Sequence, residues 1–316
     1  VRFSSIRRAR ALWKGTFLMM LQILETRPQF LILSVLLVLH AAALAAARGH
    51  VVDWFLVVLA MAGLVLLHAS VNVLNDWHDY ARTGIDLKVR RTPFSGGSGL
   101  LPAGRISAGG ALRLGLGTLA AGCLVGLYLA WVAGPPLLVI GLVGALSVVS
   151  YTPWLTRIGF GEVFAGLSLG VLPVVGTYFL LTGRLDTAAW VSGIPAGCLT
   201  YNLLLLNEFP DAEADIAGAR RHMVVLLGKR KAARLYTVVE LAAYVSLLAG
   251  VGAGVLHPWA LLGLGGALFA CKAIAVALRE YDSFEGIIPG MGVNVASVLG
   301  TNALMAAGYG IAALAR

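Results

Sequence analysis

Nine apolar segments, most of them about 17–25 residues long, restrict the folds that this chain can adopt. Hydrophobic residues make up 59% of its 316 residues and charged residues only 12%, against roughly 25% in ordinary soluble domains. We therefore expect an all-α, polytopic membrane protein with nine transmembrane helices, the fourth short and the last long. The expected spans are Pro28–Ala47, Trp54–Val73, Ala111–Val132, Pro136–Val149, Val163–Thr182, Ala188–Leu206, Leu235–Val255, Trp259–Ala277 and Ile287–Leu314.

The basic residues predict the orientation of these helices. With a cytoplasmic N-terminus, all of the 24 Lys and Arg residues except Arg48, Arg184 and Arg316 fall on the cytoplasmic side. The positive-inside rule therefore predicts a multi-pass protein of the cell membrane with its N-terminus inside. The expected outer connections are very short, so we place the functional site on the cytoplasmic face. The net charge of +9 then follows mostly from topology and requires no nucleic-acid partner.

We expect one integral-membrane domain over residues 1–316. Two pseudo-repeats, about 27–150 and 160–285, would be followed by a last helix. Residues 1–25 mix basic and apolar side chains in a pattern typical of an amphipathic helix at the membrane interface. The sequence gives no indication of oligomeric state.

A polar stripe follows the second expected span. Asn72, Asn75, Asp76 and Asp79 have the i, i+3, i+4, i+7 spacing that places them on one helix face. An acidic residue costs about 2.5–3.5 kcal/mol at the centre of a membrane helix, and less near its end. The stripe therefore indicates either a cation site facing a cavity or a helix end that continues into a polar loop.

A second motif of the same kind ends the sixth expected span. Asn207 and Asp211 repeat the spacing of Asn75 and Asp79, and Asp215 extends the same helix face. Membrane proteins with internal repeats often bind their ligands at the repeat interface. The repetition therefore favours one shared site over two ordinary helix ends.

The cytoplasmic connection between these motifs contains basic residues and a run of glycine and serine, Pro93–Gly99. Glycines can expose backbone N–H groups to an anion in a nest. A flexible linker is the alternative interpretation. Lys88, Arg90 and Arg91 would suit a phosphate group, although basic residues are expected in any inner loop.

Two carboxylate clusters facing one cavity cannot stay ionised without counter-charges. Mg²⁺ accepts a few carboxylates and takes phosphate oxygens as further ligands. These residues therefore predict an anionic diphosphate substrate, and the membrane setting predicts a lipid tail on it. Ionisation of an allylic diphosphate uses such a site, because metal and cations stabilise the departing pyrophosphate while the carbocation alkylates an electron-rich acceptor.

The two motifs resemble the aspartate-rich motifs of UbiA-type intramembrane prenyltransferases, and the resemblance covers nearly the whole chain. It implies a helical bundle around a central cavity with a lateral opening for the prenyl tail. It further implies a Mg²⁺ site made of Asn75, Asp79, Asp86, Asn207, Asp211 and Asp215. The implied diphosphate contacts are Lys88, Arg91, Arg157 and Arg221, and the candidate catalytic residues are Asp79, Asp211, Lys88, Arg157 and Tyr151.

Segments that begin at Arg91, Tyr151, Gly176 and Arg220 resemble the 1,4-dihydroxy-2-naphthoate polyprenyltransferases of menaquinone synthesis. This resemblance implies that a polyprenyl group is transferred from polyprenyl diphosphate to that aromatic acceptor. It also implies acceptor-side roles for Tyr151 and Glu162. The chain departs from the pattern in the spacing of Asp79 and Asp86, and in His222, which stands where threonine is usual. Other acceptors of the superfamily, such as 4-hydroxybenzoate, homogentisate or a glycerol phosphate ether, stay open.

Two other classes share single features. Asp76-x-x-Asp79-Tyr-Ala-Arg82 superficially resembles the CDP-alcohol phosphotransferase signature, but Tyr80 stands where that signature has glycine. Cation-coupled secondary transporters also have repeats and half-buried carboxylates. Their polar residues usually lie near the membrane midplane, whereas both motifs here lie at helix ends that we expect to be cytoplasmic. We therefore favour the prenyltransferase interpretation over both.

Overall fold

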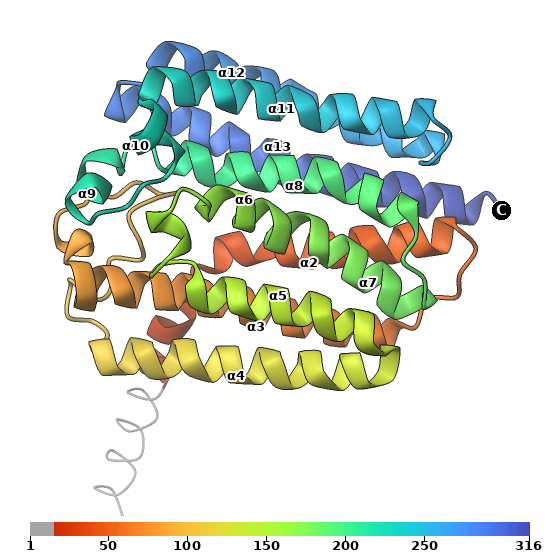
Figure 1. Cartoon of the computed structure of the whole chain (residues 1–316), viewed down its shortest axis with the longest axis horizontal. Helices are drawn as coiled ribbons and strands as arrows, with labels where there is room; N and C mark the ends of the chain where they lie inside the picture. Colours follow the sequence, from red (N-terminus) through yellow and green to blue (C-terminus); the bar gives the residue numbers. More distant parts are fainter. Residues whose placement is uncertain (1–15) are drawn as a thin grey trace, which may run out of the picture.

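The computed structural model describes residues 16–316, and this range is helical and contains no strand (Figure 1). Most of the predicted N-terminal amphipathic segment, residues 1–15, lies outside the described residues. Its last part, Thr16–Glu25, forms a short apolar helix. This helix exposes Phe17, Leu18, Met19, Met20, Ile23 and Leu24.

Long helices lie side by side in one bundle (Figure 1). They are α2 (Pro28–Ala47), α3 (Trp54–His78), α4 (Ala108–Ala133), α5 (Pro135–Ser150), α8 (Thr187–Asn207), α11 (Lys229–Gly252), α12 (Ala267–Glu280) and α13 (Phe284–Leu314). Two further spans are composite: α6 (Gly161–Gly166), η4 (Leu167–Val171) and α7 (Leu172–Thr182) form one, and η5 (Pro258–Gly266) precedes α12 in the other. Short elements make the connections: η1 (Asp79–Thr83), η2 (Ile85–Leu87), η3 (Leu155–Arg157), α9 (Ala212–Ala217) and α10 (Met223–Leu227).

Eight helical segments of the described chain are long and apolar enough to cross a membrane. They correspond to eight of the nine expected spans. The remaining span, expected over Pro136–Val149, forms α5, whose 16 residues are fewer than a typical spanning helix has. The second span extends further than we expected, because α3 and η1 keep the first acidic motif helical as far as Thr83.

Serine and aspartate side chains fix several helix starts. Asp53 accepts hydrogen bonds from the first backbone N–H groups of α3, and Asp186 does the same for α8. Ser107 and Ser283 cap α4 and α13. Such caps satisfy N–H groups that no helical carbonyl can reach, so the connections between spans can be short.

Small residues set the closest contacts between helices. A Cβ on Gly170 would lie 2.5 Å from the Cα of Gly197, and one on Gly308 would lie 2.0 Å from the carbonyl oxygen of Trp259. Neither position has room for a side chain. Backbone-to-backbone contacts of this kind hold helices together in a bilayer, where burying apolar side chains gains little.

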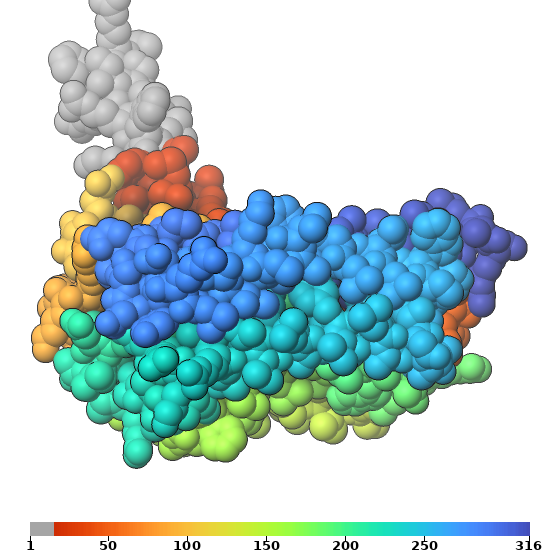
Figure 2. Space-filling view, turned by 90° about the horizontal axis from the view of Figure 1, so that it is seen from above, coloured from red at the N-terminus to blue at the C-terminus, as the bar shows by residue number. Residues whose placement is uncertain are grey.

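Buried hydrogen bonds join the helices of the second half. Glu240 of α11 is fully buried and accepts from Asn202 Nδ2 at 2.7 Å and from Ser297 Oγ at 2.9 Å. The outer face of α11 is apolar instead, and Figure 2 shows the face that α11 and α12 form together. Its exposed side chains include Leu241, Val245, Leu248, Leu268 and Phe269, as expected for a surface that contacts lipid.

Both acidic motifs lie at the same end of the bundle, where α9, α10 and the connection between α3 and α4 gather (Figure 1). The first motif is the end of α3, and the second is the end of α8 together with α9. The repeat in the sequence therefore corresponds to two helix ends that face each other.

Candidate active site

One cavity of about 240 Å³ lies between the acidic motifs. All six residues that the sequence predicts as metal ligands line it: Asn75, Asp79, Asp86, Asn207, Asp211 and Asp215. The rest of its wall is largely apolar and includes Phe30, Leu33, Leu64, Leu67, Val71, Val148, Phe164, Leu169, Leu203 and Leu204. The cavity thus combines a cluster of oxygen donors with a surface suited to a hydrocarbon chain.

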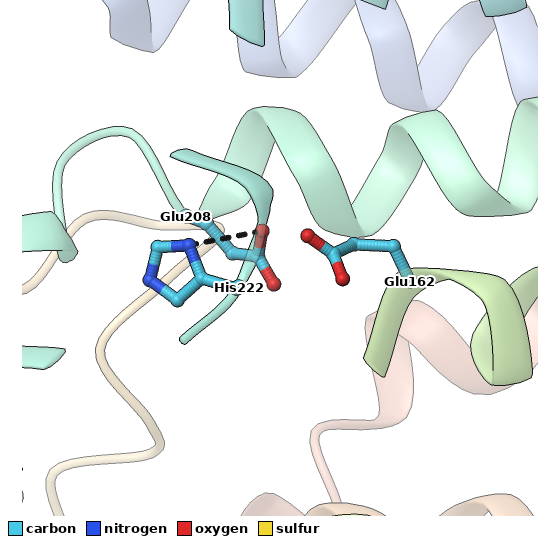
Figure 3. Close-up of side chains that lie close together, drawn as sticks. All are labelled: Glu162, Glu208 and His222. Carbon is cyan, nitrogen blue, oxygen red and sulfur yellow. Dashed lines mark ion pairs between the residues drawn. The ribbon is translucent and has the colours of Figure 1, made fainter. Parts of the chain in front are cut away.

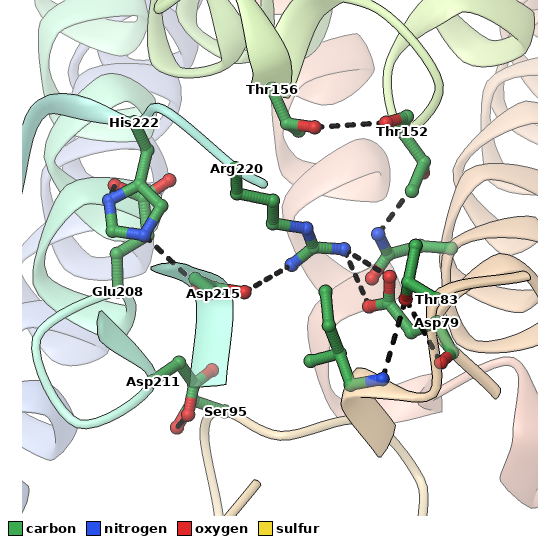
Figure 4. Close-up of polar contacts among 12 residues, drawn as sticks. Asp79, Thr83, Ser95, Thr152, Thr156, Glu208, Asp211, Asp215, Arg220 and His222 are labelled. Carbon is green, nitrogen blue, oxygen red and sulfur yellow. Dashed lines mark hydrogen bonds and ion pairs between the residues drawn. The ribbon is translucent and has the colours of Figure 1, made fainter. Parts of the chain in front are cut away.

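Arg220 joins the two motifs across the cavity (Figure 4). Its Nη2 donates to both carboxylate oxygens of Asp79 at 2.5 Å, and its Nη1 donates to Asp215 Oδ1 at 3.1 Å. Burial alone would lower the pKa of Arg220, but Asp79 and Asp215 outweigh it and raise this pKa further above its ordinary value. Arg220 is therefore permanently charged and shared between one carboxylate of each motif.

The Gly/Ser loop, Pro93–Gly99, contacts both motifs through its backbone and its serines. Ser95 Oγ and the Gly96 N–H each donate to the carboxylate of Asp211 at 3.1 Å, and the Ser98 N–H donates to Asp76 Oδ2 at 2.7 Å. The interpretation of this run as a flexible linker is therefore wrong. Its N–H groups do face anions, but those anions are the protein's own carboxylates.

Asp211 has no ion-pair partner among the described residues and depends on these neutral donors. Burial and the neighbouring Asp215 raise the pKa of the Asp211 carboxyl to about 7. A carboxylate with so little counter-charge is suited to receive a cation.

The basic residues expected to contact a diphosphate lie outside this cavity. Lys88, Arg91, Arg157 and Arg221 are exposed, and none of them lines the cavity. Arg91 instead forms an ion pair with Asp86 and donates to the Asp86 carbonyl oxygen at 2.7 Å. The pKa of Asp86 still rises to about 6, because burial outweighs Arg91. In the described chain, the arginines that line the cavity are Arg27 and Arg220.

Arg220 could not be chosen from the sequence, since it stands beside the equally basic Arg221. The backbone conformation determines which of the two arginines points into the cavity. Ala219 has a left-handed conformation with φ of 61°, and the Arg221 N–H donates to the Thr156 carbonyl oxygen at 2.8 Å. This turn directs Arg220 into the cavity and leaves Arg221 exposed.

Glu162, Glu208 and His222 form a buried cluster (Figure 3). One donor atom from each lies within 4.8 Å of the others, and His222 Nδ1 is 3.4 Å from Glu208 Oε2. Burial, followed by the charge of Glu162, raises the pKa of Glu208 well above its ordinary value. Three such ligands could hold a transition metal, and one atom of each residue, Glu162 Oε2, Glu208 Oε2 and His222 Nδ1, is buried without a hydrogen-bond partner among the described residues.

His222 Nε2 lies 3.0 Å from Asp215 Oδ2, so the cluster is joined to the second acidic motif. The sequence pointed to Glu162 as an acceptor-side residue, but it is fully buried and does not line the cavity. Tyr151 does line it. Glu162 is connected to the cavity through its cluster neighbours Glu208 and His222, both of which line it.

Comparison with known families agrees with this site. The sequence pattern of the UbiA prenyltransferase family matches residues 35–285. The chain belongs to the UbiA prenyltransferase family. It is therefore a prenyltransferase, as the two acidic motifs predicted.

Curated relatives of this UbiA-family chain include several 1,4-dihydroxy-2-naphthoate octaprenyltransferases. The one from Mycobacterium tuberculosis is 28% identical over 253 residues, which are 78% of this chain and 82% of the relative. The one from Bacillus subtilis is 27% identical over 237 residues, 74% of each chain. A protoheme IX farnesyltransferase from Symbiobacterium thermophilum is 34% identical, but over 172 residues that cover 52% of this chain and 51% of the relative.

Solved structures share the fold. A UbiA homologue from Aeropyrum pernix K1 superposes with a TM-score of 0.69 at 18% identity, covering 88% of this chain and 96% of that one. A UbiA homologue from Archaeoglobus fulgidus bound to GPP and Mg²⁺ gives a TM-score of 0.59 at 16% identity, covering 93% and 99%. At these identities the comparison shows that this chain has the fold of the UbiA prenyltransferases.

The donor set of this UbiA-family site fits Mg²⁺. Six carboxylates and three side-chain amides line the cavity, among them all six predicted ligands, and hard oxygen ligands of this kind are those that Mg²⁺ prefers. Asn207 Oδ1 is buried and has no hydrogen-bond partner among the described residues, so it is free to bind a cation. Asn75 is oriented by the hydrogen bond that its Nδ2 donates to Thr152 Oγ1 at 3.1 Å.

Glu25 is a buried carboxyl that the sequence did not single out. It accepts a hydrogen bond from Ser98 Oγ at 2.6 Å, and its Oε1 has no partner in the described chain. Burial raises its pKa from 4.5 to about 7. A carboxyl whose pKa is raised on folding contributes stability below its unfolded pKa, and this stability is lost as pH rises through about 7.

We expect Glu25→Gln to raise the unfolding midpoint at about pH 8 by a few degrees and to change it little at about pH 5. Ionising the buried carboxyl costs up to about 3 kcal/mol, which the amide avoids while still accepting from Ser98. Thermal unfolding of the detergent-solubilised protein at the two pH values measures the difference. An equal shift at both would show that burial does not perturb Glu25.

Proposed function

We propose that this chain transfers a polyprenyl group from polyprenyl diphosphate to 1,4-dihydroxy-2-naphthoate, in a Mg²⁺-dependent step of menaquinone biosynthesis. The observation that carries this proposal is the single cavity in which both acidic motifs meet an apolar wall. The 1,4-dihydroxy-2-naphthoate octaprenyltransferases of three bacteria, which match 74% to 81% of this chain, support the choice of acceptor.

In this proposal Asp79, Asp211 and Asp215 hold Mg²⁺ with the amide oxygens of Asn75 and Asn207, and Asp86 completes the set. When bound, the metal supplies positive charge that stabilises the departing pyrophosphate. Arg220 and Arg27, the arginines that line the cavity, add further positive charge on the diphosphate side.

The apolar wall has two roles in the proposed reaction. It holds the prenyl chain along α3, where Leu64, Leu67 and Val71 precede Asp79 by two to four helical turns. It also keeps water away from the allylic carbocation, so that the carbocation meets the aromatic acceptor first. Tyr151, which lines the cavity near Glu208, is the residue that we propose to orient the acceptor ring.

We further propose that α5 counts as a ninth span and that the N-terminus and the site face the cytoplasm of the cell membrane. The support for this orientation is the distribution of basic residues. Arg48, Arg184 and Arg316 lie at the end of the bundle opposite the site, and the connections at the site end carry most of the others.

A product assay tests the proposed function. Purified protein is incubated with Mg²⁺, a polyprenyl diphosphate and each of several acceptors, and products are identified by mass spectrometry. We expect prenylated product from 1,4-dihydroxy-2-naphthoate and none after removal of Mg²⁺ with EDTA. Product from 4-hydroxybenzoate or haem instead would overturn the choice of acceptor. Haem belongs in the panel because one relative is a protoheme IX farnesyltransferase.

A further inference from the structure

Arg220 lies between the two acidic motifs and forms ion pairs with a carboxylate of each (Figure 4). Both carboxylate oxygens of Asp79 accept hydrogen bonds from the Arg220 guanidinium, and one oxygen of Asp215 does so. One positive charge is thus shared by two carboxylates. The same carboxylates line the cavity and belong to the donor set that fits Mg²⁺.

These contacts and metal coordination compete at Asp79. A metal ion bound by either Asp79 oxygen would lie close to the guanidinium, because Arg220 Nη2 is 2.5 Å from both oxygens. Two cations at that separation repel, and the repulsion is strong because the side chains of Arg220 and Asp79 are largely buried. Arg220 therefore weakens metal binding at Asp79 as long as it stays paired with that carboxylate.

Asp215 differs from Asp79 in having a second partner. His222 Nε2 lies 3.0 Å from Asp215 Oδ2, while Arg220 uses Oδ1. The orientation of Asp215 is therefore kept when Arg220 leaves. For Asp79 the described chain provides only the distant His78 Nδ1, 3.9 Å from Oδ1, so this carboxylate becomes free to bind a new cation.

We propose that Arg220 is the resident counter-cation of the acidic motifs, and that it exchanges Asp79 and Asp215 for the diphosphate when the substrate binds with Mg²⁺. The proposal rests on the proposed function for the identity of the diphosphate ligand. A guanidinium suits both partners, because its planar N–H groups match carboxylate and phosphate oxygens alike. Mg²⁺ alone offers Arg220 no new partner, so Mg²⁺ alone binds weakly.

This exchange couples the two ligands. Diphosphate draws Arg220 away from the carboxylates and so raises their affinity for Mg²⁺, and by linkage Mg²⁺ raises the affinity for diphosphate to the same degree. Removal of the arginine charge must abolish this part of the coupling. It must also strengthen the binding of Mg²⁺ alone, which a residue that merely orders the site would not do.

Titration calorimetry with Mg²⁺ alone, and then with inorganic pyrophosphate present, tests the exchange in wild type and Arg220→Gln. We expect pyrophosphate to tighten Mg²⁺ binding by wild type by about tenfold or more. We expect Arg220→Gln to bind Mg²⁺ alone about tenfold more tightly than wild type, and to lose most of the effect of pyrophosphate. Unchanged or weaker Mg²⁺ binding in Arg220→Gln would overturn the proposal.

Thermal unfolding gives a second readout. In EDTA, Arg220→Gln should unfold at a lower temperature than wild type, because Asp79 and Asp215 then repel without a counter-charge, and Mg²⁺ alone should restore the midpoint. A midpoint that Mg²⁺ leaves unchanged would count against the exchange. If Arg220→Gln does not fold, Arg220→Lys replaces it. A lysine contacts one carboxylate at a time, so its Mg²⁺ affinity should exceed that of wild type.

Arg230→Ala is the matched control, because Arg230 is an exposed arginine at the start of α11 without a side-chain ion pair or hydrogen bond in the described chain. Arg230→Ala should bind Mg²⁺ with the affinity of wild type. An increase in Mg²⁺ affinity equal to that of Arg220→Gln would show that net charge alone causes the effect, and it would overturn the proposal. None of these measurements uses a prenyl donor or an acceptor. Failure of the product assay and failure of the exchange are therefore separate results.

Discussion

Replacing Asp211 with asparagine should lower turnover by at least about a hundredfold and leave the protein folded. Asp211 lines the cavity, has no ion-pair partner in the described chain and is held by Ser95 and Gly96. Asparagine can still accept a hydrogen bond from these donors, but it brings no negative charge to the metal. Pyrophosphate release from polyprenyl diphosphate measures the loss, and the unfolding midpoint checks the fold.

Asp79→Asn should lose activity to a similar degree, and it should also shift the unfolding midpoint because Arg220 loses its bidentate partner. Asp211→Asn is therefore the cleaner test of metal binding. Glu213→Gln is its matched control, since this acidic residue lies two positions along the chain but is exposed and does not line the cavity. Full activity in Asp211→Asn would remove Asp211 from the metal site, and a loss in Glu213→Gln would show that charge in this segment matters without contact.

The second large effect is expected from Gly97→Ala in the Gly/Ser loop. Gly97 has φ of 74°, and a Cβ there would lie 3.0 Å from Asp76 Oδ1. The substitution thus adds about 1–2 kcal/mol of backbone strain and pushes the loop away from the carboxylate. Because Ser95 and Gly96 of the same loop hold Asp211, we expect at least about tenfold lower kcat/KM and a higher Mg²⁺ requirement.

Gly104→Ala tests whether the effect of Gly97→Ala comes from backbone strain or from displacement of the loop. Gly104 has φ of 65°, but a Cβ there would meet nothing within 4 Å. This variant therefore carries a similar backbone cost without a clash, and its activity should stay close to that of wild type. Equal losses of activity in both variants would show that the strain, and not the position of the loop against Asp76, controls the site.

Much of the fold could be predicted because a bilayer leaves the chain few alternatives. Each long apolar segment had to be a helix, and eight of the nine expected spans are long enough to cross a membrane in the described chain. Helix ends were harder to predict. Polar residues normally mark the end of a span, yet α3 and η1 continue to Thr83, because the polar stripe faces a cavity and not water.

The acidic residues that line the cavity could be predicted from the sequence, and the arginines that line it could not. Helical spacing fixes the direction of Asn75 and Asp79 relative to each other, and the repeat supplied Asn207 and Asp211. Lys88, Arg91, Arg157 and Arg221 lie in connections, where a single turn decides which side chain points inward. The left-handed Ala219 is such a turn, and no property of the two adjacent arginines reveals it.

The short helix α5 has a consequence for the membrane around the protein. Its 16 residues extend over about 24 Å, whereas the hydrocarbon layer of a bilayer is about 30 Å thick. With α5 as the proposed ninth span, lipids beside it would tilt or shorten their acyl chains to match it, at a cost of fractions of a kcal/mol for each ångström. Since Gly144, Ser147 and Val148 of this helix line the cavity, the hydrophobic mismatch lies at the wall of the site. From this proposed span we expect the rate of the reaction to depend on the acyl-chain length of the surrounding lipid.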